Sequence, residues 1–352
     1  MTDLLELTAE LVAMPSESFH EAAIVAWLER ELRAVDGLEV TRVGDNLVAR
    51  TTLGRPERIV LAGHTDTVPE NAGNGRARIE GDTLWGLGAA DMKSGLAVML
   101  ELARTVPDPA VDVTYVFYAR EEVAAEHSGL GELARERPDL LAGDLAVLGE
   151  GSRGGVEAGC QGTLRVEVRL AGARSHTARP WMGRNAVHRL GPLLDAVAAV
   201  PERRPVLAGC EYREALQAVR VEGGVAGNVV PDLAVLTLNH RFAPDRTEEE
   251  AAAFVRSVVA PFVEDGDEVV VVDSAPAAAP AVDHPRLARV IADHALEVRS
   301  KLGWTDVARF AALGIPAVNI GPGDPSLAHT VDERVERAPL EATHAALRDL
   351  IG

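Results

Sequence analysis

Two residues with metal-binding side chains follow the apolar run RIVLA at 58–62. They are His64 and Asp66, in the segment GHTDTVP at 63–69. A strand that ends here would place both side chains just beyond its carboxyl end, which is where open α/β sheets bind their ligands. Imidazole and carboxylate groups together form the usual ligand set of Zn²⁺ and similar divalent ions. The segment is therefore a candidate metal site.

Five further candidate ligands stand in similar positions. One carboxylate lies in a glycine-rich turn, WGLGAADMKSG, two follow the apolar run VTYVFY, one follows LAVL, and a histidine lies in a late loop. They are Asp91, Glu121, Glu122, Glu150 and His329. Two ions about 3.5–4 Å apart need at least one carboxylate that bridges them, and this set contains several. Each residue alone has an ordinary explanation, such as a helix cap or a loop histidine, so only the combination favours a metal site.

The composition excludes several classes of protein. The chain has 352 residues, of which 47% are hydrophobic and 25% charged, and its formal net charge is −19. These values are typical of a globular protein and argue against long disordered segments. So acidic a chain repels nucleic-acid phosphates and anionic membranes, which leaves small molecules and cations as the expected partners. The length suggests two domains.

Cysteine content and the N-terminal sequence predict a cytoplasmic location. Cys160 and Cys210 are the only cysteines, too few for a disulfide framework. The first residues, MTDLLELTAEL, carry acids where a secretory signal needs a basic region. No stretch reaches the roughly 18–20 uninterrupted apolar residues that cross a bilayer. We therefore expect a protein of the reducing cytoplasm, with no membrane partner and no nucleic-acid partner.

Strands and helices alternate in the first part of the chain. Apolar residues at a spacing of three to four predict helices over the ranges 4–12, 21–35, 93–105 and 129–137. Short apolar or alternating runs predict strands over 38–43, 46–51, 58–62, 113–118 and 145–148. Such alternation predicts an α/β fold with a mostly parallel sheet that helices cover on both faces.

The pattern changes after Gly159. Long alternating strands are expected at 163–170 and 233–241, with helices at 185–200 and 247–262, which is an α+β pattern. An Ala/Pro-rich stretch at 274–281 predicts a linker, and the α/β pattern then resumes with a helix at 285–295, a strand at 317–320 and a helix at 340–350. We therefore expect a catalytic domain of residues 1–161 and 276–352, interrupted by an inserted domain of residues 162–275.

Seven motifs give the chain a resemblance to a known family. They are GHTDTVP at 63–69, GLGAADMKSG at 86–95, the pair Glu121 and Glu122, GEGS at 149–152, SHTARPWMGRNA at 175–186, NVVPD at 228–232 and GPGDPSLAHTVDE at 321–333. In order and spacing they resemble the M20 family of di-zinc amidohydrolases and peptidases, over nearly the whole chain. The resemblance implies a di-zinc catalytic domain with an inserted lid and dimerisation domain.

The resemblance assigns a role to each candidate ligand. It implies that Asp91 bridges two Zn²⁺ ions, for which Co²⁺ or Mn²⁺ could substitute. His64 and Glu150 would complete one site, and Glu122 and His329 would complete the other. It also implies a cis peptide bond between Asp91 and the methionine that follows it.

The same resemblance implies a mechanism. Zinc lowers the pKa of a bound water from 15.7 towards about 7, and Glu121, as general base, takes its proton and later returns it to the leaving amine. The carboxylate of Asp66 would fix the tautomer of the ligand His64. His176 matches a lid histidine that stabilises the oxyanion from the partner subunit, so the active site would be complete only in a homodimer.

The substrate is also implied by resemblance. Within the family the motifs are most similar to desuccinylases of actinobacteria, which implies hydrolysis of N-succinyl-LL-2,6-diaminopimelate in lysine and cell-wall precursor synthesis. The residues that match substrate-binding positions are Asn228, Arg241, Thr305 and Gly323. A succinyl group ends in a free carboxylate, and so acidic a protein needs a local cation to bind it. Arg241 is the candidate.

One departure from the family pattern leaves the acyl group open. Proteobacterial desuccinylases carry a basic pair at the start of the inserted domain, whereas this chain has Cys160 and Gln161. Either Arg241 or Arg165 binds the succinyl group, or the acyl group is different. The alternatives are another M20 deacylase, such as an N-acetylornithine deacetylase, an aminoacylase or a carboxypeptidase. A catalytically silent relative is disfavoured, because the five ligands and Glu121 are all present.

Overall fold

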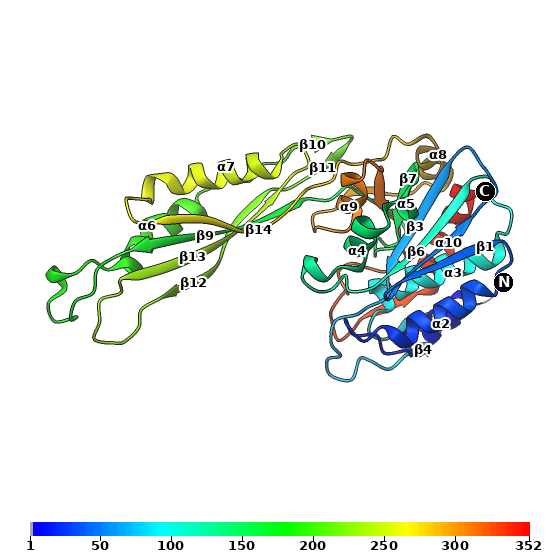
Figure 1. Cartoon of the computed structure of the whole chain (residues 1–352), viewed down its shortest axis with the longest axis horizontal. Helices are drawn as coiled ribbons and strands as arrows, with labels where there is room; N and C mark the ends of the chain where they lie inside the picture. The colour runs from blue at the N-terminus through cyan, green and yellow to red at the C-terminus, as the bar shows by residue number, and fades with distance from the viewer. Residues whose placement is uncertain (1–2) are drawn as a thin grey trace. The chain divides into compact units, whose positions relative to one another are not determined.

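This computed structural model describes residues 3–352 of the chain. They divide into two compact units. The first contains the described chain up to Gly159 together with Pro280–Arg299 and Asp306–Gly352, and the second contains Cys160–Ala279 and Ser300–Thr305. Figure 1 labels the principal helices and strands of each unit. Among the described residues, no helix has the length and apolar character needed to span a membrane.

Eight strands form the main sheet of the first unit. Their order is β1 (Leu38–Val43), β2 (Asn46–Thr51), β6 (Asp112–Tyr118), β3 (Arg58–His64), β7 (Leu145–Leu148), β16 (Ala317–Asn319), β8 (Val156–Ala158) and β15 (Val298–Ser300). The central strands β6, β3, β7 and β16 run parallel to one another, whereas β1, β2 and β8 pair antiparallel with their neighbours. The predicted fold class, α/β with a mostly parallel sheet, is confirmed.

Helices cover both faces of this sheet (Figure 1). One face and the helices on it share the largest hydrophobic core. Those helices are α1 (Leu4–Val12), α2 (Ala22–Arg33), α3 (Ser94–Thr105), α8 (Pro285–Asp293) and α10 (Arg337–Ile351). The other face contacts α4 (Gly129–Glu136), α5 (Pro138–Leu141) and α9 (Val307–Ala312). Because neither face meets water, all residues of β6 are buried and the strand lacks polar alternation.

The parallel strands bring their following turns to one edge of the sheet. β3 ends at His64, which lies opposite Tyr118, the last residue of β6. Leu148, the last residue of β7, lies opposite Ala62 of β3, and β16 runs parallel beside β7. His64 ends β3, and the turns that leave β6, β7 and β16 contain Glu121, Glu122, Glu150 and His329, whereas Asp91 lies in the turn after β5. Since the carboxyl ends of parallel strands meet at the same edge, the fold itself gathers these turns.

A second, three-stranded sheet is absent from the sequence-based prediction. It contains β4 (Arg78–Glu80), β5 (Thr83–Trp85) and β17 (Arg334–Glu336), with β5 in the centre. Strands of three residues are too short to give a recognisable period, and β17 lies far from β5 in the sequence. β17 follows the loop that carries His329, and β5 precedes the turn that carries Asp91. The small sheet therefore joins these two loops.

The second unit is an antiparallel sheet with two helices on one face. The strand order is β12 (Ala215–Gly223), β13 (Leu233–Phe242), β9 (Gly162–Ala171) and β14 (Glu268–Ala275). The helices α6 (Ala186–Ala198) and α7 (Glu248–Val259) share a hydrophobic core with this sheet. Side chains along β9 alternate between buried and more exposed, as they do in a sheet with one open face.

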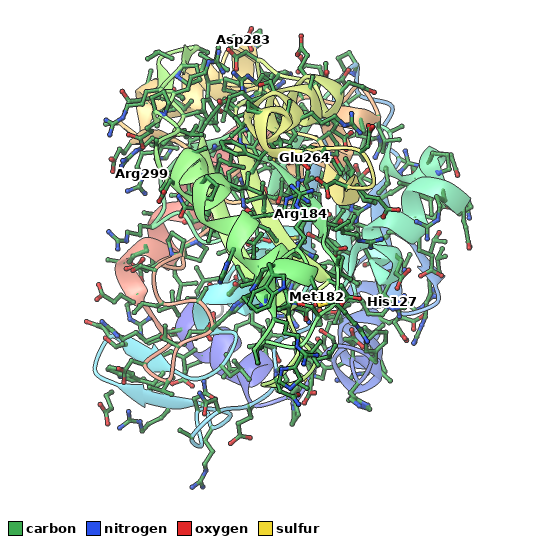
Figure 2. The ribbon with its side chains drawn as sticks, turned by 90° about the vertical axis from the view of Figure 1, so that its left-hand side faces the viewer. His127, Met182, Arg184, Glu264, Asp283 and Arg299 are labelled. Atoms are coloured by element: carbon green, nitrogen blue, oxygen red, sulfur yellow. The ribbon has the colours of Figure 1, made fainter. Side chains whose placement is uncertain are left out.

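Local sequence explains where the helices of the second unit begin. The Asn185 side chain accepts hydrogen bonds from the first backbone N–H groups of α6, and Thr247 with Glu250 forms a capping box at α7. Arg184 and Glu264, labelled in Figure 2, form an ion pair of 2.7 Å just outside the two helices. Shorter elements are β10 (Val206–Leu207), β11 (Cys210–Glu211), and the turns η1 (Ala89–Lys93), η2 (Ala125–His127), η3 (Pro180–Met182) and η4 (Ala260–Phe262).

Two long strands of this unit differ from the sequence-based expectation. β12 is missing from the prediction because nearly all of its residues are exposed, so it lacks the buried alternate positions that indicate a strand. β14 occupies the first part of the expected linker at 274–281 and runs to Ala275. Beyond it, Ala278 still pairs with Cys160 in an isolated bridge. Alanine and proline are not typical of strands, so the composition of this segment does not indicate that it pairs with the edge of the sheet.

Gly95 allows α3 to approach the turn after β7. A Cβ atom built on Gly95 would lie 2.3 Å from the carbonyl oxygen of Gly149. Gly95→Ala should force the helix away from the sheet, and overpacking of this kind costs about 1–3 kcal/mol. We expect a lower Tm by differential scanning calorimetry.

Gly191→Ala is the matched control for this substitution. Gly191 is exposed in α6, and its Cβ position has nothing within 4 Å. Alanine favours a helix over glycine by about 1 kcal/mol, so this variant should keep or raise the Tm. An unchanged Tm in Gly95→Ala would contradict the close contact between α3 and the turn after β7.

Candidate metal centre

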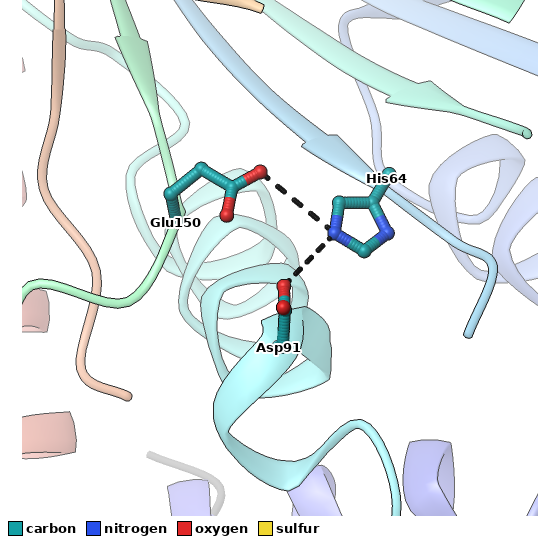
Figure 3. Close-up of side chains that lie close together, drawn as sticks. All are labelled: His64, Asp91 and Glu150. Carbon is teal, nitrogen blue, oxygen red and sulfur yellow. Dashed lines mark hydrogen bonds and ion pairs between the residues drawn. The ribbon is translucent and has the colours of Figure 1, made fainter. Parts of the chain in front are cut away.

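His64 ends β3 and is almost completely buried. Its Nδ1 lies 3.0 Å from the backbone carbonyl oxygen of Asp66, which can only accept a hydrogen bond. In the neutral ring Nδ1 therefore carries the hydrogen and Nε2 keeps its lone pair. Nε2 lies 3.1 Å from Asp91 Oδ1 and 3.7 Å from Glu150 Oε1 (Figure 3). These three groups converge as the ligands of one cation would.

Asp91 lies in the irregular turn η1, which opens α3. Its two oxygens face different histidines: Oδ1 is 3.1 Å from His64 Nε2, and Oδ2 is 3.4 Å from His329 Nε2. The peptide bond between Asp91 and Met92 is cis, as the family resemblance predicts. A carboxylate with one oxygen towards each imidazole has the arrangement of a bridging ligand.

His329 and Glu122 form the other side of the cluster. His329 Nε2 lies 2.8 Å from Glu122 Oε1. His329 belongs to the loop after β16, where its backbone φ is +62°, and half of its side chain is exposed. A non-glycine residue in this left-handed region is uncommon and must be held there by its surroundings. This side of the cluster is thus built on a loop, whereas His64 is part of a strand.

Three overlapping groups of side chains could each hold an ion. Within each group the ligand atoms lie within 4.8 Å of one another. The groups are His64, Asp91 and Glu150; Asp91, Glu122 and His329; and His64, Glu121 and Glu122. The first two share Asp91. The structure therefore brings together the five ligands expected from the sequence, with Glu121 beside them.

The carboxylates at this edge of the sheet are crowded and buried. Burial, with the nearby charges of Glu150 and Asp306, raises the pKa of Glu121 well above its usual value, although His64 opposes the shift. Burial likewise raises the pKa of Glu122. Hydrogen bonding to Asp91 raises the pKa of His329 to about 9.

Burial raises the pKa values of the two glutamates and neighbouring carboxylates raise that of His329, so the cluster as a whole favours added positive charge. Without an ion, protons on the two histidines provide it. Two imidazoles among carboxylates also form a donor set that suits Zn²⁺ and similar divalent ions, which would replace those protons. The residues present therefore fit a divalent cation.

Asp66 organises the turn after β6. Its Oδ1 accepts a hydrogen bond from the Glu121 N–H at 2.9 Å, and its Oδ2 accepts from the Glu122 N–H at 3.1 Å and from the Ser18 hydroxyl at 2.7 Å. Burial alone would raise the pKa of Asp66, but His64 and these donors lower it to about 2.

The Asp66 backbone also contacts the ring of His64. The sequence interpretation has the Asp66 carboxylate fix the His64 tautomer, and in the structure His64 Nδ1 also donates to the Asp66 backbone carbonyl oxygen. The carboxylate itself lies 3.5 Å from Nδ1. The same carboxylate also holds the backbone of Glu121 and Glu122.

Glu333 is a candidate functional residue that the sequence interpretation misses. Its side chain is 2% exposed, and Oε1 accepts hydrogen bonds from the N–H groups of Ala90 at 2.9 Å and Asp91 at 3.0 Å. Lys93 is equally buried and donates from Nζ to the Met14 carbonyl oxygen at 2.8 Å. Burial raises the pKa of Glu333 to about 7 and lowers that of Lys93 to about 7. No local pattern reveals this role, because it depends on the pairing of β17 with β5.

Gly323 lies in the first unit, where the loop after β16 touches the Asp91 turn. A Cβ atom on Gly323 would lie 2.0 Å from the carbonyl oxygen of Ala90. Its own carbonyl oxygen accepts a hydrogen bond from the Arg153 N–H at 2.8 Å. Only glycine allows this approach, so Gly323 helps to keep the His329 loop against the turn that carries Asp91.

The other residues singled out from the sequence lie in the second unit. His176 and Asn228 are in neighbouring loops, because the Thr177 N–H donates to the Asn228 carbonyl oxygen at 3.0 Å. His176 is exposed, and its Nδ1 accepts a hydrogen bond from the Ala178 N–H at 3.0 Å. In the neutral ring Nε2 therefore carries the hydrogen and is available as a donor.

Arg241 is in β13, in the sheet of the second unit. The alternate residues Leu238 and Phe242 of this strand belong to the core with α6 and α7, so Arg241 lies on the opposite face, which the helices leave open. Burial and the nearby Arg165 lower the pKa of Arg241. Within residues 3–352 no carboxylate lies at ion-pair distance from it. Thr305 is buried in the same unit, where its carbonyl oxygen accepts from the Cys160 thiol at 3.7 Å.

Comparison with known families and proteins places this geometry in context. Residues 60–352 match the model of peptidase family M20/M25/M40. A putative succinyl-diaminopimelate desuccinylase of Mycobacterium tuberculosis is 51% identical over 353 residues, covering 99% of this chain and 98% of the relative. The succinyl-diaminopimelate desuccinylase of Corynebacterium glutamicum is 45% identical over 338 residues, covering 94% and 91%.

Solved structures share the fold at lower identity. A tripeptidase from Staphylococcus aureus superposes with a TM-score of 0.78 at 20% identity, covering 99% of this chain and 97% of that one. An M20 family metallo-carboxypeptidase from Sulfolobus solfataricus gives 0.77 at 16% identity, covering 100% and 99%. At these identities the likeness concerns the fold alone.

A divalent cation should stabilise the protein through this cluster. An ion that binds only the folded state, at a hundredfold excess over its Kd, contributes about 2.7 kcal/mol. We expect Zn²⁺ added to chelator-treated protein to raise the Tm by about 5 °C. Glu150→Gln, which removes a charged ligand, should reduce the shift.

Glu126→Gln is the control for this measurement. The Glu126 side chain is 77% exposed in η2 and belongs to none of the three groups. The Glu126→Gln variant should show the same increase in Tm as the wild type when Zn²⁺ is added. A full increase in Glu150→Gln would exclude Glu150 as a ligand.

Proposed function

The chain belongs to peptidase family M20/M25/M40, and from that premise we propose that it is a metal-dependent amide hydrolase that cleaves N-succinyl-LL-2,6-diaminopimelate into succinate and LL-2,6-diaminopimelate. Asp91 carries the proposal, because its two oxygens face His64 and His329 separately. The two relatives named as succinyl-diaminopimelate desuccinylases, at 51% and 45% identity, support the choice of substrate.

The proposed cofactor is a pair of Zn²⁺ ions. His64, Asp91 and Glu150 would hold one, and Asp91, Glu122 and His329 would hold the other. Co²⁺ and Mn²⁺ accept the same ligands and are alternatives. Ions of this kind, when bound, polarise an amide carbonyl and increase the acidity of water.

Glu121 is the proposed general base. Its backbone N–H is fixed by Asp66, so the side chain starts from a defined point at the edge of the sheet. Glu121 takes a proton from the attacking water as the water oxygen bonds to the amide carbon. It then returns that proton to the nitrogen as the C–N bond breaks, which releases an amine and a carboxylic acid that loses its remaining proton to water or to the amine at neutral pH.

His176 is the proposed donor to the oxyanion that forms on the amide oxygen. Its Nδ1 is occupied by the Ala178 N–H, so the neutral ring has its hydrogen on Nε2. A donor already oriented towards developing negative charge lowers the barrier. By resemblance to the family, His176 would act in the active site of a partner subunit, with the second unit serving as lid and dimerisation domain of a cytoplasmic homodimer.

Arg241 is the proposed partner of the succinyl carboxylate. It is a half-buried cation on which the positive charge of Arg165 acts more strongly than the negative charge of Asp273. An anionic substrate group would relieve both the burial and the repulsion, whereas a neutral acetyl group would not. Asn228, Thr305 and Gly323 would contribute the other substrate contacts.

The substrate proposal is tested by parallel assays of two amides. Zinc-loaded protein should hydrolyse N-succinyl-LL-2,6-diaminopimelate and leave N-acetyl-L-ornithine intact. Glu121→Gln should lower kcat by about 10²–10⁴, the range for loss of a general base. Amide hydrolysis is followed directly by loss of absorbance in the far ultraviolet.

Each other outcome is informative. Turnover of the acetyl substrate alone would replace the succinyl assignment with another M20 deacylase. Full activity of Glu121→Gln, with zinc content equal to the wild type, would exclude Glu121 as the base.

The role of His176 across subunits is tested by combining two inactive variants. In a heterodimer of Glu121→Gln and His176→Ala, one active site lacks both residues and the other has both. Random assembly after coexpression should therefore restore about a quarter of wild-type activity. If His176 serves its own subunit, every site keeps one defect and the mixture stays inactive.

A further inference from the structure

Glu333 connects two loops of the candidate metal centre. It follows His329 by four residues and directly precedes β17. Its side-chain Oε1 accepts from the N–H groups of Ala90 and Asp91, at 2.9 and 3.0 Å. Its backbone carbonyl oxygen accepts from the Gly86 N–H at 3.0 Å, at the other end of the same turn. One residue of the His329 loop therefore holds the Asp91 turn at two points.

A buried carboxylate is a costly way to hold a turn. Glu333 is 2% exposed, and removal of a charged group from water is unfavourable unless bonds compensate it. Here the compensation comes from two N–H donors, with the buried Lys93 amine close enough for its charge and that of Glu333 to interact. Because one oxygen accepts from two adjacent N–H groups, the backbone of the turn is fixed at two neighbouring residues.

The opposite side of the centre uses the same arrangement. There Asp66 accepts from the consecutive N–H groups of Glu121 and Glu122, at 2.9 and 3.1 Å. In both places a buried carboxylate binds two successive backbone N–H groups of a turn that carries a candidate ligand. The repetition indicates a common requirement, which is to orient a ligand that lies outside any regular element.

We propose that Glu333 is a positioning residue for the metal pair, which fixes Asp91 so that its oxygens face His64 and His329 at once. The inference rests on the proposed metal centre. His64 and Glu150 stand at strand ends, so their group needs little further support. His329 stands on an exposed loop, and its distance from Asp91 depends on the Glu333 contacts and on β17 pairing with β5.

Loss of Glu333 should therefore weaken one ion more than the other. The group of Asp91, Glu122 and His329 should lose affinity, while the group of His64, Asp91 and Glu150 keeps most of its own. Removal of residues that orient metal ligands typically lowers metal affinity by about 10–100-fold. We expect an affinity loss in this range for the ion held by Asp91, Glu122 and His329.

The experiment titrates chelator-treated protein with Co²⁺, by calorimetry and by the visible absorption of the bound ion. Wild type should bind two ions. Glu333→Met, which keeps the volume but removes the acceptor, should weaken the second ion by about 10–100-fold and alter its absorption. Glu333→Gln keeps an oxygen acceptor without the charge, so its effect should be smaller and in the same direction.

Asp112→Leu is the control for a purely structural effect. Asp112 is a buried carboxylate at the start of β6 that accepts from the N–H groups of Leu53 and Arg55, at 2.8 and 2.9 Å. It has the same type of contacts at the opposite end of the strand from the metal centre. This variant should lower the Tm and leave both ion affinities unchanged.

The outcomes separate this inference from the proposed function. Fewer than two Co²⁺ ions on the wild type would contradict the metal pair itself. Two ions on the wild type and equal affinities in Glu333→Met would overturn the positioning role alone, as would equal weakening of both ions. If Glu333→Met does not fold, Glu333→Gln decides, and affinities within twofold of wild type would overturn the inference.

Discussion

The candidate metal centre depends on buried carboxylates that each accept two successive backbone N–H groups. The turns that carry Asp91 and Glu122 leave N–H groups that neither strand pairing nor a helix can satisfy. A buried group of this kind left without a partner costs about 1–3 kcal/mol. Glu333 and Asp66 satisfy these donors in pairs and bring the turns into defined positions. Ligand side chains can then converge although their backbone is irregular.

The charge at this edge of the sheet gives a reason for the cation. Asp66 and Glu333 add negative charge around a cluster that already contains Glu121, Glu122 and Glu150. In a chain of net charge −19 there is no general excess of cations to neutralise them. The two histidines compensate only when protonated, which the raised pKa of His329 reflects. A divalent ion supplies the same charge at one point, so its binding and the stability of the folded unit are linked.

The parts of this centre that could be predicted from the sequence are those that follow from local pattern. β3 and β6 are apolar runs with clear ends, and open α/β sheets bind ligands beyond such ends, so His64 and Glu121 could be placed together. The roles of individual ligands came from the family resemblance. Glu333 could not be identified, because its two hydrogen bonds exist only after β17 has paired with β5, and strands of three residues leave no period to read. The hydrogen bond from His64 Nδ1 to the Asp66 backbone carbonyl could not be predicted either, because every residue has a carbonyl group and the sequence does not show which one accepts.

The two halves of the centre differ in how they are supported, and this difference has a consequence for the metal pair. His64 is a strand residue, nearly fully buried and hydrogen-bonded through Nδ1 to its own chain. His329 is half exposed, has a left-handed backbone and shares its loop with Gly323, which touches the Asp91 turn. Ordering such a loop opposes binding by the entropy that is lost, whereas a strand end is ordered already. The ion held by His329 should therefore bind more weakly than the ion held by His64. Because Asp91 belongs to both groups, its orientation affects both ions, and the effect is larger for the ion whose histidine lies on a loop.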